Sequence, residues 1–332
     1  GVEAWYEPPS TGYERAIARK PVSMENLSWI RNNSLHHKDN WRTDSLEDAI
    51  DEVKLFRRAG GETLVDVTPK NVGQDPKRVR AVSFETGVTV IQGTSYYTRA
   101  AHPDGLDDRS IEELTAEFVS DVVEGIGDTK IRAGIVGEIG VSGGIHEVEK
   151  RVLRAGARAA VQTGAPLTIH PPGLPRRLED VPTQPPSEWG LRLLDIVEEE
   201  GLAPERVVID HMDRTLFADL DYQKQLAERG AFIEYDLWGH PAHVQANGDG
   251  YPSDAWRIEA ICELVEDGYL PNLLLSHDVA QKITLTKYGG NGYAHILENM
   301  VPALQFWGLT DGQIQTLLVD NPRRILTFAE PA

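Results

Sequence analysis

Four residues with metal-binding side chains stand at the ends of separate apolar segments. The segment RAGIVGEIG carries Glu138 between glycines, and three later apolar runs lead into His170, His211 and Asp278. An ionised carboxylate is costly to remove from water unless a cation, a proton or a metal ion meets it. A glutamate, two histidines and an aspartate at the ends of buried strands therefore predict one metal site with nitrogen and oxygen ligands.

Each of these residues has a structural explanation when it is taken alone. A single histidine at a strand end is more often a hydrogen-bonded packing residue than a ligand, so the prediction depends on the four together. His240 and His243 also have a metal-like spacing, but they lie in a loop that contains Pro and Gly, and we interpret them as a loop feature. Asp236, at the end of another apolar run, either faces the site or caps a helix.

The elements that must position these residues alternate between strand and helix patterns. The predicted strands are 62–68, 88–97, 132–140, 166–170, 206–213, 231–236 and 272–278. The predicted helices are 43–59, 75–87, 110–125, 146–163, 187–200, 221–229, 253–267, 294–307 and one from 310 onward, with capping boxes at 110–113 and 310–313. Strict alternation requires parallel strands, because each helix must carry the chain back to the start of the next strand.

Seven predicted strands are one short of a (β/α)8 TIM barrel. A doubly wound open sheet is the alternative, but that fold carries a GxGxxG loop after its first strand, and the sequence contains none. Polar residues at strand ends also favour the barrel, whose functional sites lie at the carboxyl ends of its strands. We predict one α/β domain over residues 1–332, with an irregular N-terminal arm at 1–43 and C-terminal helices at 294–332.

Charge and composition exclude several classes of partner. The formal net charge of −19 argues against nucleic-acid binding, which needs a basic surface. No apolar run reaches the roughly 18 residues of a membrane-spanning helix, and the single cysteine, Cys262, favours a reducing compartment. We expect a soluble, cytoplasmic protein with neither a membrane nor a nucleic-acid partner. The acidity is typical both of halophilic sources and of ordinary cytosolic enzymes.

Several short motifs, in this order, are specific enough to indicate a family. They are GGETLVDVT at 60–68, GTSYY at 93–97, RAGIVGEIG at 132–140, LSHD at 275–278, YGGNGY at 288–293 and NPRRIL at 321–326. Together they resemble the phosphotriesterase family of the amidohydrolase superfamily, in its glutamate-bridged branch.

This resemblance implies a TIM-barrel hydrolase with a hydroxide held between two divalent ions, usually Zn2+, with Mn2+ or Co2+ as alternatives. Glu138 is similar to the ligand that bridges the two ions from the fourth strand. His170 and His211 are similar to the histidine ligands of the fifth and sixth strands, and Asp278 to the aspartate ligand of the eighth. Tyr97 is similar to a tyrosine near the metals, although an aromatic residue at a strand end is also common packing.

Roles beyond the metal ligands follow from the same comparison. Asp278 is expected to relay the proton of the attacking water, and Tyr97 to lie near the leaving group. Arg257, between the last two strands, is expected to contact the substrate. Asp213 and His277 are candidate partners behind the ligands.

The sequence departs from the family at one point. The family's first strand ends in His-x-His, which supplies two metal ligands, and no His-x-His occurs in this sequence. His36 and His37 are no substitute, because adjacent side chains on a strand point to opposite faces. Our hypothesis is that the first strand of a (β/α)8 barrel is missing from the sequence as given.

The predicted function is metal-dependent hydrolysis of a small lactone, carboxylic ester or phosphotriester, with a lactone or ester preferred. The alternative is a catalytically inactive barrel that serves as a binding or scaffold protein. Residues 171–186 and 239–252 are expected to form much of the pocket rim. Arg176 and Arg177 there either attract an anionic substrate or are solvated. The family also suggests a homodimer.

Overall fold

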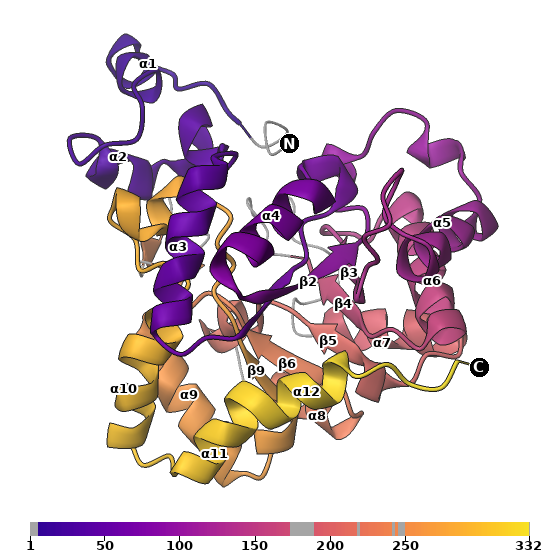
Figure 1. Ribbon diagram of the computed structural model, residues 1–332. Coiled ribbons are helices and arrows are strands. Elements are labelled where there is room, and N and C mark those ends of the chain that lie inside the picture. The colour runs from indigo at the N-terminus through magenta and orange to yellow at the C-terminus, as the bar shows by residue number, and fades with distance from the viewer. Residues whose placement is uncertain (1–5, 173–188, 218–219, 241–242, 245–249, 332) are drawn as a thin grey trace.

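The computed structural model describes all residues except 1–5, 173–188, 218–219, 241–242, 245–249 and 332. Its centre is a seven-stranded parallel sheet with helices packed around it (Figure 1). The strands, in spatial order, are β1 (Thr63–Asp66), β2 (Thr89–Thr94), β3 (Ile135–Gly140), β4 (Leu167–His170), β5 (Val207–Ile209), β6 (Phe232–Tyr235) and β9 (Leu273–Leu275). The seven predicted parallel strands and the α/β class are therefore confirmed.

Helices connect successive strands as the alternating pattern predicts. They are α4 (Pro76–Thr86), α5 (Ile111–Val123), α6 (Glu147–Thr163), α7 (Trp189–Glu199), α8 (Leu220–Glu228) and α9 (Asp254–Glu266), while α3 (Leu46–Arg58) precedes β1. After β9 the chain forms a π-helical turn at Ile296–Met300 and helices α10 (Val301–Phe306), α11 (Asp311–Gln315) and α12 (Asn321–Leu326). Both predicted capping boxes are present, with Ser110 capping α5 and Thr310 capping α11. No helix among the described residues is both long and apolar enough to span a membrane.

Two short features differ from the predicted elements. The N-terminal arm, which the sequence predicts to be irregular, contains α1 (Gly12–Ala18) and α2 (Leu27–Asn32). Helix α1 begins at a capping box between Thr11 and Glu14 but buries none of its residues, so it has no apolar periodicity to detect. A two-stranded antiparallel ribbon, β7 (His243–Val244) with β8 (Gly250–Tyr251), was also not predicted.

The N-terminal arm holds the loop that follows β9. In Figure 1 the indigo arm lies against the orange segment that follows β9. A small apolar cluster joins the two segments through Val22, Leu27, Ile30 and Ile283. The Asn40 side chain accepts a hydrogen bond from the Ile283 amide at 3.1 Å, and Lys282 Nζ lies 2.6 Å from Asp39. Because Asp278 begins this loop, residues far away in the sequence help to fix its position.

The sheet is open at one place. Strands β1 and β9 are its two edges, and they are not hydrogen-bonded to each other. A cavity of about 1930 Å³ extends from Val65 on β1 and Leu274 on β9 to the carboxyl ends of the strands. The described strands therefore form an open sheet with the strand order of a barrel, and the closed eight-stranded barrel is not observed.

Two glycines let the ends of β2 and β3 approach each other closely. A Cβ atom on Gly140 would lie 2.2 Å from the Thr98 amide nitrogen, and one on Gly93 would lie 2.2 Å from the Gly137 carbonyl oxygen. Real Cβ atoms do not come so near to backbone atoms, so only glycine fits at these positions. This close approach brings Tyr97, just after β2, to the end of β3.

We predict that Gly140→Ala destabilises the protein by about 2–3 kcal/mol, because the added methyl group must push two backbone segments apart. Gly143→Ala is the matched control, since a Cβ atom there meets no atom within 4 Å. Urea unfolding of both variants measures the difference. Equal stabilities would show that the β2 and β3 ends tolerate a wider separation.

Candidate metal centre

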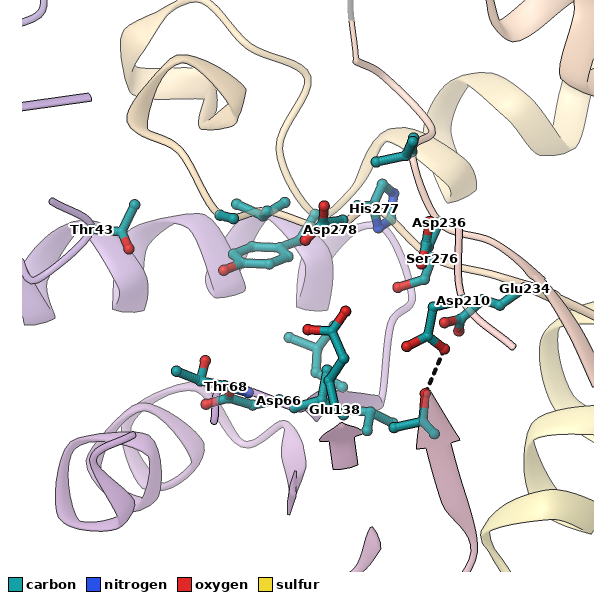
Figure 2. A pocket seen from close by; sticks show the side chains of 18 of the residues that line it. Thr43, Asp66, Thr68, Glu138, Asp210, Glu234, Asp236, Ser276, His277 and Asp278 are labelled. Atoms are coloured by element: carbon teal, nitrogen blue, oxygen red, sulfur yellow. Dashed lines mark hydrogen bonds between the residues drawn. The ribbon is translucent and has the colours of Figure 1, made fainter. Parts of the chain in front are cut away.

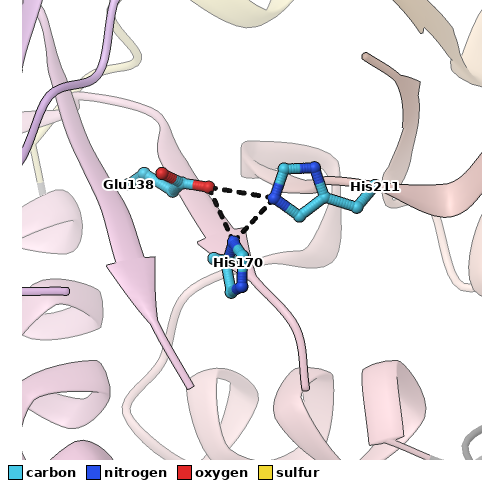
Figure 3. A group of neighbouring side chains, drawn as sticks. All are labelled: Glu138, His170 and His211. Carbon is cyan, nitrogen blue, oxygen red and sulfur yellow. Dashed lines mark hydrogen bonds and ion pairs between the residues drawn. The ribbon is translucent and has the colours of Figure 1, made fainter. Parts of the chain in front are cut away.

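Three of the predicted ligands converge at the carboxyl ends of neighbouring strands. Glu138 lies on β3, His170 ends β4, and His211 follows β5 (Figure 3). His170 Nδ1 lies 3.0 Å from Glu138 Oε1 and 2.6 Å from His211 Nε2, and His211 Nε2 lies 3.3 Å from Glu138 Oε1. Two imidazole nitrogens and a carboxylate oxygen directed at one point are a donor set that fits a divalent ion.

The charge state of this group follows from burial and from its internal contacts. Burial alone would raise the pKa of Glu138, but hydrogen bonds from His170 and His211 lower it to about 2. Burial and the charge of His211 lower the pKa of His170. In the protein alone the group therefore contains an ionised carboxylate and at least one neutral imidazole, the forms that bind metal ions.

Asp236, at the end of β6, orients His211. Its Oδ1 lies 2.8 Å from His211 Nδ1, and its Oδ2 accepts the His211 backbone N–H at 3.1 Å. Burial opposes a charge on His211, yet Asp236 raises the pKa of this imidazole well above its usual value. Of the two alternatives for Asp236, the structure thus supports the one in which it faces the site. A carboxylate behind a histidine is typical of metal sites, where it fixes the ring orientation.

Asp278 lines the same cavity but stands apart from the three converging residues. Figure 2 shows Glu138 and Asp278 projecting into the cavity from opposite walls. Asp278 is accessible from the cavity, but the protein around it limits hydration and raises its pKa to about 7. Its φ of 42°, like that of 58° at His211, is uncommon for a residue other than glycine. Backbone conformations of this kind concentrate at functional sites, where they direct side chains.

Tyr97 touches His170 directly. Its hydroxyl oxygen lies 3.0 Å from His170 Nδ1, and the two rings meet edge to face with centroids 4.8 Å apart. Burial and the charge of Glu138 raise the pKa of Tyr97 well above its usual value, so the phenol stays neutral and can donate a hydrogen bond. The predicted position of Tyr97 near the ligands is thus what the structure shows.

Arg257 is not placed where the sequence predicts. Its side chain is completely buried, with Nε 2.6 Å from Asp213 and Nη1 2.8 Å from Asp254. Burial raises the pKa of Asp213 to about 6 against the charge of Arg257, and Asp213 also accepts the Leu237 amide. Arg257 therefore supports the segment after β6 instead of contacting a substrate, because its two carboxylate partners enclose it.

Two other histidines have structural contacts. The Ile296 amide donates to His277 Nε2 at 3.2 Å, and burial lowers the pKa of His277 to about 3, so the ring is turned toward the C-terminal helices. His240 Nε2 lies 2.9 Å from the His277 carbonyl oxygen, and its ring stacks on Tyr251. The side chain of His243 and the pair Arg176 and Arg177 lie outside the described part of the structure.

A second acidic group lies inside the sheet, next to the three converging ligands. Asp210, Glu234 and Asp236 have carboxylate oxygens within 4.8 Å of one another, and Thr168 Oγ1 donates to Asp210 Oδ1 at 2.5 Å (Figure 2). Burial, with the neighbouring carboxylates, raises the pKa of Glu234 to about 8 and that of Asp210 well above its usual value. Of these residues only Asp236 is predicted from the sequence to lie near the site; the signal for Asp210 and Glu234 is a charged residue within each of the apolar runs VVID and FIEYD.

The strand order and the histidine-carboxylate group together define a barrel-type α/β protein with a candidate metal centre. The chain belongs to the Phosphotriesterase family, whose sequence profile matches residues 7–326. It is 36% identical over 326 residues to an N-acetyltaurine hydrolase of Bos taurus, an alignment that covers 97% of this chain and 89% of the relative. The family prediction made from the motifs is therefore confirmed.

Solved structures agree with this assignment. A resiniferatoxin-binding protein from Rhodobacter sphaeroides is 40% identical, with a TM-score of 0.91, over 98% of this chain and 87% of that one. A lactonase from Listeria monocytogenes is 26% identical, with a TM-score of 0.75, over 94% of each chain. Relatives that are named as hydrolases support a hydrolase activity for this chain.

We predict that Glu234→Gln changes how the stability of the metal-free protein depends on pH. The pKa of Glu234 is about 8 in the folded state and near 4.5 when the chain is unfolded, so the folded protein keeps this proton to a higher pH. Stability should therefore fall as pH rises from about 4.5 to 8, because the unfolded state then binds fewer protons. Glutamine at position 234 cannot ionise, so the free energy of unfolding of the variant relative to that of the wild type should rise by on the order of 2 kcal/mol between pH 5 and pH 8.

Urea unfolding of chelator-treated protein at several pH values measures this difference. Glu298→Gln removes an exposed carboxylate and should give a curve parallel to that of the wild type. A Glu234→Gln difference that is the same at pH 5 and pH 8 would show that Glu234 is already ionised in the folded protein.

Proposed function

We propose that this protein is a metal-dependent hydrolase that adds water to an acyl carbonyl group, in a small amide, lactone or ester. The observation that carries the proposal is the convergence of Glu138, His170 and His211 on one point in a large cavity. The names of two of the relatives, an N-acetyltaurine hydrolase and a lactonase, support the same chemistry. N-acetyltaurine contains an amide and a lactone contains a cyclic ester, and hydrolysis of either begins with attack on a carbonyl carbon.

The donor set fits the proposed metal. His170, His211 and Glu138 would hold a divalent ion, and Asp278, on the same cavity, would contribute to holding a second. We propose Zn2+ as the natural ion, since two imidazoles and carboxylates suit it, with Mn2+ or Co2+ as substitutes. When bound, such ions lower the pKa of water toward neutrality and polarise a carbonyl oxygen.

The chain's own residues would then supply orientation and proton transfer. Asp236 holds the His211 ring by two hydrogen bonds, so the ligand nitrogen keeps its direction. Asp278, open to the cavity, accepts the proton released from water and passes it to the leaving group. The neutral hydroxyl of Tyr97 donates a hydrogen bond to the substrate beside His170.

A protein that only binds ligands is the less favoured alternative. In such a protein the buried, ionised carboxylate of Glu138 would have no function. An apolar residue could then replace it, because replacing a buried charged group by a well-packed apolar one is often neutral or stabilising. Its retention, together with that of Asp236 behind His211, supports the catalytic proposal.

We predict that Glu138→Gln removes bound metal and lowers the hydrolysis rate at least about 100-fold, because an amide oxygen cannot replace the bridging carboxylate. Elemental analysis of purified protein gives the metal content, and assays with N-acetyl amides, lactones and esters follow reconstitution with Zn2+, Mn2+ or Co2+. The exposed Glu298→Gln variant serves as the control. Full metal occupancy in Glu138→Gln would contradict the proposed centre.

We predict that Asp236→Asn weakens metal binding by about 10–100-fold, because asparagine keeps the shape but supplies no charge to His211. Competition titration with a metal-binding dye measures the affinity. Asp320→Asn, which breaks a surface ion pair with Arg323, should leave the affinity unaltered. Equal affinity in Asp236→Asn and wild type would mean that His211 does not need Asp236 for its orientation.

A further inference from the structure

We propose that Arg214 binds an anionic group of the substrate and so makes the enzyme selective for acyl compounds that carry a sulfonate or carboxylate. This inference depends on the proposed function and names the substrate class of the same site.

Arg214 follows His211 closely in the chain and lines the same cavity as the candidate metal centre. Arg214 lies in the 3-10 segment Met212–Phe217 that directly follows His211, and its backbone N–H donates to the His211 carbonyl oxygen at 3.0 Å. The residue is half-buried and lines the same cavity as Tyr97, Glu138 and Asp278. A ligand held at the converging side chains therefore lies in the cavity that Arg214 faces.

The charge of Arg214 acts on three residues of the site. Burial raises the pKa of Tyr97 and Asp278 and lowers that of His170, and the positive charge of Arg214 is a smaller influence toward a lower pKa at each of the three. These residues come from β4 and from the segments after β2 and β9. The charge of Arg214 therefore acts on residues from several walls of the cavity in which a substrate would be held.

The rest of the inner cavity is acidic. Its wall includes the carboxyl groups of Glu138, Asp210, Glu234, Asp236 and Asp278. Three other cations on the wall pair with carboxylates: Lys282 with Asp39, Arg78 with Asp75 and Arg323 with Asp320. The raised pKa of Glu234 keeps its carboxyl group neutral near pH 7, but the ionised carboxylate of Glu138 would still repel an anionic substrate unless a cation met it.

Arginine is suited to this task. Its planar guanidinium has five N–H donors and binds sulfonate or carboxylate oxygens with two parallel hydrogen bonds, so it can keep a protein partner and still hold an anion. A short acyl amide with an anionic tail would place its carbonyl at the converging ligands and its anion at Arg214. A neutral lactone would make no use of Arg214.

The test compares an anionic substrate with a neutral one of similar shape. N-acetyltaurine and N-propylacetamide share the amide, and only the first carries a sulfonate. In Arg214→Met we expect the ratio of kcat/KM for N-acetyltaurine to that for N-propylacetamide to fall by about 30-fold or more, mainly through KM. Arg214→Lys should restore part of the ratio, since it keeps the charge but not the paired donors.

The control removes a charge at a different part of the cavity. Arg323 lies on α12, whose Asn321 bonds the carbonyl of Leu273 at the start of β9, so Arg323→Met lies near the opposite ends of the strands. In Arg323→Met the ratio of kcat/KM for N-acetyltaurine to that for N-propylacetamide should equal the ratio in the wild type. A second readout needs no turnover: calorimetry of N-acetyltaurine with chelator-treated protein should show binding that weakens at least about 10-fold in Arg214→Met and in high salt.

The outcomes separate this inference from the proposed function. Equal losses for both amides in Arg214→Met would overturn the anion-binding role, and so would a wild-type preference for N-propylacetamide or a neutral lactone, although the hydrolase proposal would stand. If no metal gives any hydrolysis, the proposed function fails. The calorimetry then tests the role of Arg214 without turnover. If Arg214→Met binds N-acetyltaurine as tightly as the wild type, the anion-binding role is overturned; if it binds more weakly, the role is supported.

Discussion

The ionised carboxylate of Glu138 is the constraint on which the rest of the site depends. It is largely buried, yet its pKa is held near 2 because two imidazoles meet it within 3.0 and 3.3 Å. Such an arrangement needs three strand ends at one edge of the sheet, which parallel strands in sequential order supply. It also needs the close backbone approach that Gly93 and Gly140 allow. The low pKa of Glu138 therefore depends directly on the geometry of the sheet.

Behind the ligands, the buried charges are paired in succession. Asp236 supports His211, and Asp213 holds the Leu237 amide next to Asp236. Arg257 then joins Asp213 to Asp254 without any exposure to solvent. Removing one member of such a buried pair leaves an uncompensated charge and is far more costly than losing a surface ion pair. These contacts fix the backbone at Leu237, directly after Asp236, and Asp236 in turn orients His211.

Much of this could be predicted from the sequence, because strand ends of a parallel sheet meet at one edge whatever the details of packing. That rule places Glu138, His170, His211 and Asp278 on one cavity and requires no knowledge of contacts. It does not show which charged residues pair behind that edge. Arg257 lies on α9 and meets Asp213 only through tertiary packing, so the sequence alone predicts a substrate contact that the structure replaces with a buried ion pair. The short helices of the arm escape prediction because they are too brief for a periodic pattern.

The acidic interior also explains how so many carboxyl groups coexist near one site. If Asp210, Glu234 and Asp236 were all ionised, their mutual repulsion would destabilise the sheet. Burial and this repulsion instead raise the pKa of Asp210 well above its usual value and that of Glu234 to about 8, so that Glu234 keeps its proton near neutral pH. Asp236 is bound to the ring and the backbone N–H of His211. The ionised carboxylate of Glu138 faces the two imidazoles. Selective protonation therefore turns a cluster of acids into a site whose charges match divalent ions.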